Sequence, residues 1–453
     1  MKKNIVTVVI ISLVCISLVA GAIVLYLIRS SGNNRDNSNN QSITNNQDIP
    51  DNQNGQDIID TQNGQDSENG GENSVDEQNG TEQGQIDSGN NDTDQNNTGK
   101  NNNSGIIDVN NYTAPYSNVK KPDAVKALYL TGWTAGTSSA LEKFIQITNE
   151  TEINSVVIDI KDDDGVVGYE SNIPAVREIN AWKYKYNVDK VIKTLHDNGI
   201  YVIGRLVCFK DPVLSTKRPD LAVKNTSGGL WKDNSGTTWL DPYNRESWSY
   251  IIDIAKEAIE KGFDEIQFDY VRFPNDGNKK AMSFNSQGEK KYEAINEFLA
   301  YARENLPGVI LSADVFGIIC ESPEDTEDIG QYLELVGKDI EYISPMVYPS
   351  HYAFNQIVNN VQFPKPDLEP YAVVYNSLVK AKERISKVPD YKANIRPYLQ
   401  GFTASWLKQG NYQVYGAKQI REQIQAVYDA GLKEWIIWDP SNKYPVEAFE
   451  KEN

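Results

Sequence analysis

Eight short apolar segments recur along the last three quarters of the chain, and a polar or aromatic residue follows most of them. We expect strands at residues 127–131, 155–160, 201–207, 265–268, 309–313, 342–346, 395–399 and 434–438. Helical patterns fill the intervals, at residues 139–149, 188–198, 247–261, 290–305, 329–338, 377–387 and 417–430. Eight strands alternating with helices predict an α/β fold of the (β/α)8 TIM barrel type, with insertions.

Glycines mark the ends of several of these helices. Gly199, Gly262 and Gly431 each follow a helical pattern and precede an apolar segment, as expected for a helix C-cap. An open doubly wound sheet is the competing architecture, but residues 131–136 fit neither nucleotide-binding fingerprint. The long segment 208–245 is expected to shape a substrate cleft.

Two carboxyl groups are expected to face each other at the C-terminal ends of the strands, where barrel active sites lie. Asp269 follows the fourth strand and Asp314 the fifth. Neighbouring strands are about 4.8 Å apart, so the roughly 5–9 Å separation of glycosidase carboxyls is easily built. We expect Arg272 to hold Asp269 ionised and apolar neighbours to keep Asp314 protonated. The alternative is a structural Asp269–Arg272 ion pair that closes the strand end.

Several other chemistries are excluded by the residues present. The chain has two histidines, which are too few for a zinc hydrolase with two or three histidine ligands. No Gly-x-Ser-x-Gly elbow and no P-loop occurs. The run 162–164 could bind a hard cation, but it lacks the spaced ligands of a calcium loop, and a polar turn is favoured. We expect neither a metal nor a cofactor.

The remaining polar and aromatic residues near the strand ends are expected to bind substrate. Sugar rings stack on aromatic faces, and their hydroxyl groups need a few well-placed polar partners. The expected substrate-binding residues are Asp159, Lys161, Arg205, Asp241, Arg272, Tyr348, His351, Gln400, Trp438 and Asp439.

The N-terminal region predicts an attachment to a membrane. Residues 5–28 form an apolar run of about 24 residues, which as a helix spans roughly 36 Å. Lys2 and Lys3 precede it and favour a cytoplasmic N-terminus, which places the rest of the chain outside the cell. An uncleaved single-pass anchor at residues 1–30 is favoured over a cleaved signal near residues 20–22, which would make the protein secreted.

Residues 31–118 predict a disordered linker. They consist mostly of Asn, Gln, Asp, Gly and Ser, and they hold most of the net charge of −19. The barrel is expected at residues 119–453, so the acidity of the linker says little about the ligand of the barrel. An acidic chain also lacks the basic surface that binds nucleic acid. Beyond the apolar run the cysteines are Cys208 and Cys320, for which two buried thiols are favoured over a disulfide.

Six motifs resemble one known family. They are 156–162 (VVIDIKD), 239–244 (WLDPYN), 263–274 (FDEIQFDYVRFP), 312–317 (SADVFG), 344–349 (SPMVYP) and 438–440 (WDP). The resemblance, over residues 124–442, is to the Putative glycosyl hydrolase domain family, related to the alpha-amylase-like superfamily and found in bacterial envelope proteins. It implies that Asp269 holds the strand-four nucleophile position. The superfamily acid after strand five is usually Glu, so Glu321 and Asp439 are alternatives to Asp314.

Two functions remain open from the sequence. The first is an extracytoplasmic glycoside hydrolase that acts on a cell-wall or extracellular polysaccharide. The second is a non-catalytic carbohydrate-binding or wall-scaffolding barrel, which would keep the aromatics but would not need facing carboxyls. The oligomeric state is not predicted.

Overall fold

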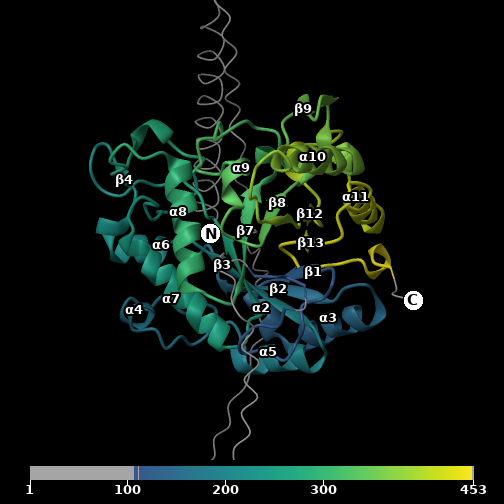
Figure 1. Ribbon diagram of the computed structural model, residues 1–453, viewed down its shortest axis with the longest axis horizontal. Coiled ribbons are helices and arrows are strands. Elements are labelled where there is room, and N and C mark those ends of the chain that lie inside the picture. Colours follow the sequence, from purple (N-terminus) through teal and green to yellow (C-terminus); the bar gives the residue numbers. More distant parts are fainter. Residues whose placement is uncertain (1–106, 111, 451–453) are drawn as a thin grey trace, which may run out of the picture. The chain divides into compact units, whose positions relative to one another are not determined.

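The chain folds into a closed parallel barrel. The computed structural model describes residues 107–110 and 112–450. Within them, one parallel sheet has the order β11-β8-β12-β13-β1-β2-β3-β5-β7, and a β7–β8 pairing closes it. Because β11 and β12 are two halves of the seventh strand, the barrel has eight strands, as the sequence predicts. Figure 1 shows the strands gathered at the centre with the helices around them.

The barrel strands in chain order are β1 (Lys126–Leu130), β2 (Ser155–Lys161), β3 (Tyr201–Val207), β5 (Glu265–Asp269), β7 (Ile310–Phe316), β8 (Tyr342–Met346), β11 (Asn394–Ile395) with β12 (Tyr398–Gln400), and β13 (Trp435–Trp438). Two small antiparallel sheets join β4 (Lys224–Asn225) to β6 (Met282–Ser283) and β9 (Gln356–Val358) to β10 (Val361–Phe363). The seventh strand is interrupted at Arg396 and Pro397, because a proline has no N–H to give to the ladder.

The helices of the described residues are α2 (Gly132–Gly136), α3 (Ser138–Glu150), α4 (Pro174–Glu178), α5 (Val188–Asp197), α6 (Pro212–Lys217), α7 (Glu246–Glu260), α8 (Lys291–Asn305), α9 (Leu333–Val336), α10 (Pro370–Ile385) and α11 (Ala417–Asp429). Gly199, Gly262 and Gly431, expected as C-caps, all have positive φ angles. Helix α10 begins seven residues earlier than expected, with Pro370 at its first position.

The helix expected at residues 329–338 is mostly absent, since α9 has only four residues. The side chain of Asp325 accepts hydrogen bonds from the N–H groups of Ile329 and Gly330, and Gly330 has a φ of 85°. This turn competes with helical hydrogen bonding at the beginning of the predicted helix, so the helix starts only after it.

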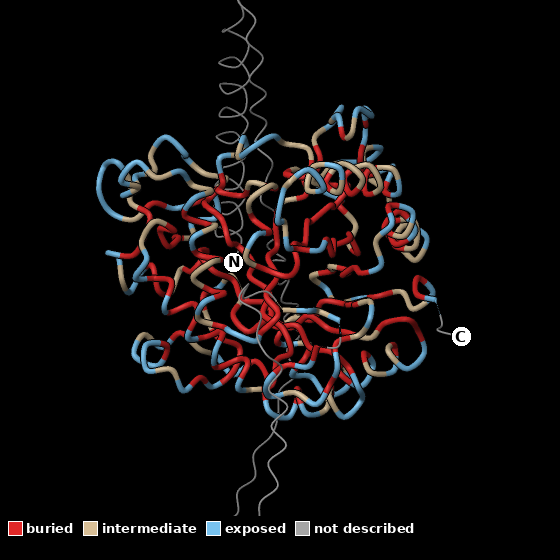
Figure 2. Tube along the Cα trace, in the orientation of Figure 1, coloured by how far each residue is buried: buried red, intermediate tan, exposed pale blue. Residues whose placement is uncertain are grey.

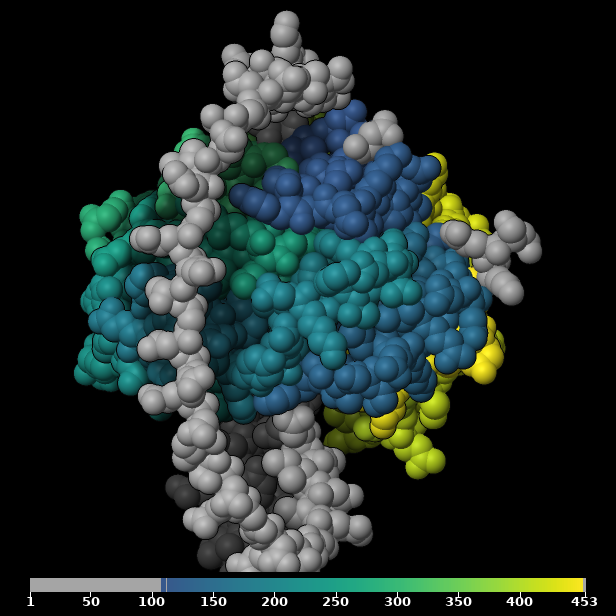
Figure 3. Space-filling view, turned by 90° about the horizontal axis from the view of Figure 1, so that it is seen from below, coloured from purple at the N-terminus to yellow at the C-terminus, as the bar shows by residue number. Residues whose placement is uncertain are grey.

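Two apolar layers hold the barrel together. The larger one packs the outer faces of the strands against the helices, and the smaller one fills the barrel interior with Tyr129, Val157, Tyr201, Tyr342 and other residues. Figure 2 shows the buried trace at the centre and exposed segments at the periphery. Seen from the side of α5, Figure 3 shows blue and teal segments packed closely over that face.

The segment before β1 packs into the N-terminal mouth of the barrel. Tyr112 is buried in the interior cluster, and its hydroxyl donates to the carbonyl groups of Asp264 and Gly308 at 3.3 Å. Packed structure therefore begins before the barrel boundary expected at Val119. The rest of the expected linker and the apolar run 5–28 lie outside the described residues. Among the described helices, none has the length and apolar character to cross a bilayer. Cys208 and Cys320 are buried free thiols, as favoured.

Candidate active site

Four ionisable side chains from consecutive barrel strands meet at the C-terminal end of the barrel interior. Asp159 on β2 is in register with Arg205 on β3. Phe268 pairs with Ala313, so Asp269 on β5 and Asp314 on β7, one residue further along, lie at the same height. Each of the four is at most 4% exposed. Burial makes their charges interact strongly, because little water screens them.

Arg205 joins two of the carboxylates. Its Nη1 donates to Asp159 at 2.7 Å, and its Nε and Nη2 lie 2.8 and 2.6 Å from one oxygen of Asp269. The guanidinium also lies 5.1 Å from the ring centroid of Trp438. The cation that contacts Asp269 is therefore Arg205, which the sequence assigned only to substrate binding.

Arg272, the expected partner of Asp269, lies among aromatic rings instead. Its guanidinium is 5.0 Å from the ring centroid of Tyr270 and 4.5 Å from that of Phe316. Its Nη1 donates to the carbonyl of Phe273 and to Asn275. The expected role of Arg272 beside Asp269 is corrected: the chain turns at Tyr270, and Arg272 helps to build the wall of loops beside the pocket.

Tyr270 adopts a left-handed conformation, with a φ of 48°. Its N–H donates to Oδ1 of Asp269 at 2.6 Å, so the turn itself holds the carboxylate. A non-glycine residue in this region costs on the order of 1–3 kcal/mol and persists only where its surroundings fix it. The strained turn supports a functional interpretation of the Asp269 end of β5.

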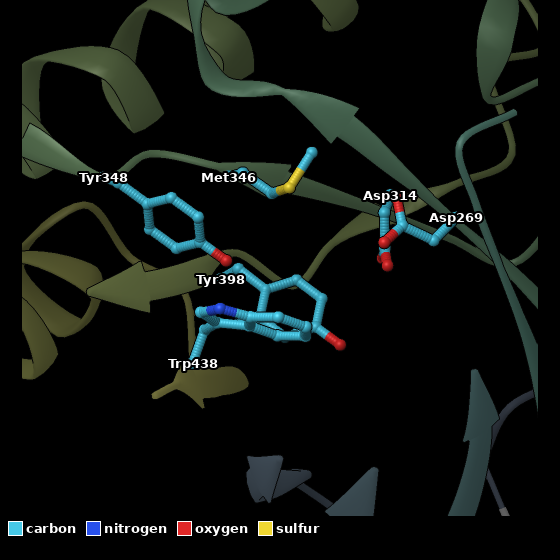
Figure 4. Close-up of a pocket in the computed structure, with 6 residues that line it drawn as sticks. All are labelled: Asp269, Asp314, Met346, Tyr348, Tyr398 and Trp438. Atoms are coloured by element: carbon cyan, nitrogen blue, oxygen red, sulfur yellow. The ribbon is translucent and has the colours of Figure 1, made fainter. Parts of the chain in front are cut away.

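Asp314 lies beside Asp269, and Figure 4 shows the two carboxyl groups next to each other in one pocket. Among the described residues, Oδ1 of Asp314 has no hydrogen-bond partner. Burial, and then the charge of Asp269, raise the pKa of Asp314 well above its usual range. Asp314 therefore keeps its proton to a higher pH than an ordinary aspartate, in the direction that its apolar sequence neighbours predict.

Asp159 is the second carboxyl group with a raised pKa. Burial and the neighbouring Asp162 raise the pKa of Asp159 to about 7, although Arg205 opposes the shift. The Tyr129 hydroxyl donates to its Oδ2 at 2.6 Å, and Arg205 contacts its other oxygen. Asp159 thus titrates close to neutral pH, at one end of a chain that runs through Arg205 to Asp269.

One methionine and three aromatic side chains form the rest of the pocket. Met346, Tyr348, Tyr398 and Trp438 line it together with the two carboxyl groups (Figure 4). Trp438 stacks on Tyr129 with ring centroids 3.8 Å apart. Of these residues, Tyr348 and Trp438 were expected from the sequence.

The sequence did not identify Tyr129, Met346 or Tyr398 as site residues. Tyr129 on β1 and Tyr398 on β12 belong to the cluster that fills the barrel interior. The period-two alternation of side chains along a strand is the signal that could have identified both tyrosines. Tyr398 also donates from its hydroxyl to Gln267, one level deeper, at 2.6 Å.

Three expected substrate-binding residues have partners within the protein. Lys161 is completely buried in an ion pair with Asp211 at 2.7 Å. The register of β2 and β3 shifts between Asp159 and Lys161, so the two side chains do not follow the regular alternation of the strand. Gln400 is buried, accepts from the N–H of Ser350 and donates to Asp367. Asp439 accepts from the N–H groups of Ser441 and Lys443 in a turn.

His351 packs edge-on against Tyr348, with ring centroids 5.1 Å apart, and so lies next to the pocket. Asp241 lies outside the set of residues that line it. Glu321, one alternative acid, accepts from the N–H of Asn359 and is likewise not a lining residue. Nowhere in residues 107–110 and 112–450 do three or more His, Cys, Asp or Glu side chains converge in a way that could hold a metal ion.

One family model matches most of the described residues. The model of the family described as Putative glycosyl hydrolase domain matches residues 127–444. A hypothetical protein from Ruminiclostridium thermocellum is 71% identical over 42% of this chain and 97% of its own, with a TM-score of 0.40. No curated protein matches the sequence.

Two further solved structures match this chain at low sequence identity. The glycoside hydrolase domain of PgaB (BpsB) from Bordetella bronchiseptica is 12% identical over 73% of this chain and all of its own, with a TM-score of 0.51. The spore cortex-lytic enzyme SleL from Bacillus megaterium is 13% identical over 73% of this chain and 74% of its own, with a TM-score of 0.42. At this level of identity the PgaB domain shows the fold alone.

Proposed function

Because the chain belongs to the Putative glycosyl hydrolase domain family, we propose that it hydrolyses glycosidic bonds of a cell-wall or extracellular polysaccharide. Asp269 and Asp314 are the working carboxyl groups in this proposal. The observation that carries it is their shared pocket, in which one carboxyl group is held by a guanidinium and the other is buried without a cation.

The different surroundings of the two groups assign their roles. Glycosidases need a protonated carboxyl group that gives its proton to the leaving oxygen, and a carboxylate that acts as base or nucleophile. The raised pKa of Asp314 suits the acid, and the contacts of Asp269 with Arg205 suit the ionised partner. Neighbouring strands hold both groups, so their spacing is fixed by the barrel and not by mobile loops.

The aromatic side chains give the site its affinity for sugar. Trp438 and Tyr398 offer ring faces at the pocket, and Tyr348 contacts Phe402. Phe402 in turn stacks on Trp406, which is 37% exposed. This row of rings leads from the carboxyl groups to the surface and suits a chain of sugar units better than a single one.

The proposed location follows from the sequence alone. A single-pass anchor at residues 5–28 would hold the barrel outside the cell. A flexible linker of about 90 residues would give it a root-mean-square reach of roughly 50–55 Å. The substrate in this proposal is therefore a glycan close to the membrane.

The proposal is tested with the full chain and with its two single variants, Asp269→Asn and Asp314→Asn. The measurement is the release of reducing ends from peptidoglycan and from soluble polysaccharides. Each replacement is expected to lower turnover by about 10²–10⁴-fold without changing the circular dichroism spectrum. The control is Asp123→Asn, which changes an exposed aspartate outside the pocket. Near-normal turnover by Asp269→Asn would contradict the assignment, and glycan binding without any bond cleavage would identify a carbohydrate-binding barrel instead.

A further inference from the structure

A second cavity lies apart from the carboxyl pair, in the long insertions at the C-terminal end of the barrel. It encloses about 420 Å³, within the range of roughly 300–1,000 Å³ that small-molecule sites occupy. One side is the small sheet in which Lys224 of β4 pairs with Ser283 of β6, so that the insertion after β3 is joined to the insertion after β5. Figure 1 shows β4 away from the barrel centre.

The two cavities are separated by a packed wall. Trp239 meets the ring of Tyr270 edge-on at 5.7 Å, and the Arg272 guanidinium is 5.0 Å from the centroid of each ring. No described residue lines both cavities. A ligand in the second cavity would therefore not touch Asp269 or Asp314.

The lining combines aromatic rings with hydrogen-bonding groups. Tyr243 and Phe284 are partly buried and meet edge-on, with ring centroids 5.9 Å apart. Asp241, which is 7% exposed, adds a carboxyl group whose pKa is raised by burial, and Asn244 and Asn285 add amides. A sugar offers apolar C–H faces to the rings and hydroxyl groups to the carboxyl and amide groups, so this lining matches both of its surfaces.

The lining charges favour an uncharged ligand. Asp220 and Asp241 contribute carboxyl groups to the lining, and Lys224 and Arg245 contribute cations. Asp220 is held in an ion pair with Arg218, and Arg245 in ion pairs with Glu289 and Glu297. Because the lining acids and bases are equal in number, the cavity offers no excess charge to an ionic ligand.

We propose that this cavity is a second saccharide-binding site, which holds an uncharged stretch of a polysaccharide away from the catalytic pocket. The ligand class rests on the proposed function, since a hydrolase of long glycans gains local substrate concentration from a second contact with the chain. Such a site raises affinity for polymers and leaves the turnover of short oligosaccharides unchanged.

The test is affinity electrophoresis of the full chain in native gels that contain glycol chitin, hydroxyethylcellulose or laminarin. Ser283→Trp places a large ring at an exposed lining position. The matched control is Ser386→Trp, the same change at the exposed end of α10, on the opposite end of the barrel. All proteins carry Asp269→Asn, so that the polymers are not degraded, and thermal unfolding checks that each variant is folded.

We expect at least one polymer to retard the parent, which carries Asp269→Asn alone, and the Ser386→Trp protein. Ser283→Trp is expected to raise the apparent Kd by about tenfold or more. A milder variant, Asn285→Ala, is expected to give an intermediate effect. Equal retardation of Ser283→Trp and the parent, or no retardation of the parent in any gel, overturns the proposal. The protein that retains Asp269 is assayed separately for glycan cleavage. If it cleaves no glycan while Ser283→Trp still removes the retardation in the gels, the proposed hydrolysis is refuted and this binding site is supported.

Discussion

Asp159 is expected to make the stability of the barrel depend on pH, and Asp159→Asn is expected to remove that dependence. The pKa of Asp159 in the folded protein is about 7, whereas an unfolded aspartate titrates near 3.9. Each pKa unit is worth about 1.36 kcal/mol, so the folded state loses on the order of 4 kcal/mol when this buried group ionises.

The sign follows from the protons bound in each state. Below about pH 4 the carboxyl group is protonated in both states and has no effect on the pH dependence. Between about pH 4 and pH 7 the unfolded chain is ionised while the folded one keeps its proton, so the free energy of unfolding falls as the pH rises. Above pH 7 the loss is complete. Asparagine does not titrate, so the variant lacks this slope.

The measurement is urea denaturation at pH 5 and pH 8, followed by circular dichroism. The free energy of unfolding of Asp159→Asn, minus that of the wild type, is expected to rise by roughly 2–3 kcal/mol from pH 5 to pH 8. Asp123→Asn, an exposed control, should show no such rise. A change below about 0.5 kcal/mol for Asp159→Asn, the size of an ordinary surface effect, would refute the view that Asp159 holds a proton in the folded barrel.

Two further predictions concern the same charged cluster. Arg205→Met removes the cation between Asp159 and Asp269 and is expected to lower the free energy of unfolding at pH 7 by about 3–5 kcal/mol. The loss should be smaller at pH 5, because the carboxyl groups left without a cation take up protons there. An equal loss at both pH values in urea titrations would argue against the ion-pair interpretation. If Asp314 is the acid, kcat/KM should stay high well above pH 4 and fall only when the pH passes the raised pKa of Asp314. An alkaline limb near pH 4, the ordinary carboxyl range, would assign the proton to another group.

The barrel could be predicted because its signals are local. Apolar segments of strand length, amphipathic helices and a glycine after each of several helices are properties of neighbouring residues, and the structure confirms all eight strands. The failures are also local in origin. Pro397 divides the seventh strand, and the Asp325 side chain takes up N–H groups that the helix expected at residues 329–338 would have used.

The partner of Asp269 could not be predicted in the same way, because it depends on the lateral pairing of strands. Arg272 is three residues from Asp269 in sequence, and this proximity suggested an ion pair. The left-handed turn at Tyr270 carries Arg272 away from the barrel interior. Arg205 is far away in sequence, yet it pairs in register with Gln267, two residues before Asp269 on the same face of β5. Only the strand order and register reveal that neighbour.

The interior of the barrel also shows why a proton is held at the level of the pocket. One level deeper, Glu265 and Arg396 are fully buried as a balanced pair, and Ser312 donates a further hydrogen bond to Glu265. At the level of the pocket, by contrast, Asp159 and Asp269 share one guanidinium, that of Arg205, and Asp314 has no ion pair among the described residues. Three buried carboxylates beside one cation would leave uncompensated charge in a region with little water, so the cluster lowers its free energy by keeping protons. In the proposed mechanism this excess of carboxyl groups over cations would keep Asp314, whose pKa is raised well above its usual range, as the proton donor.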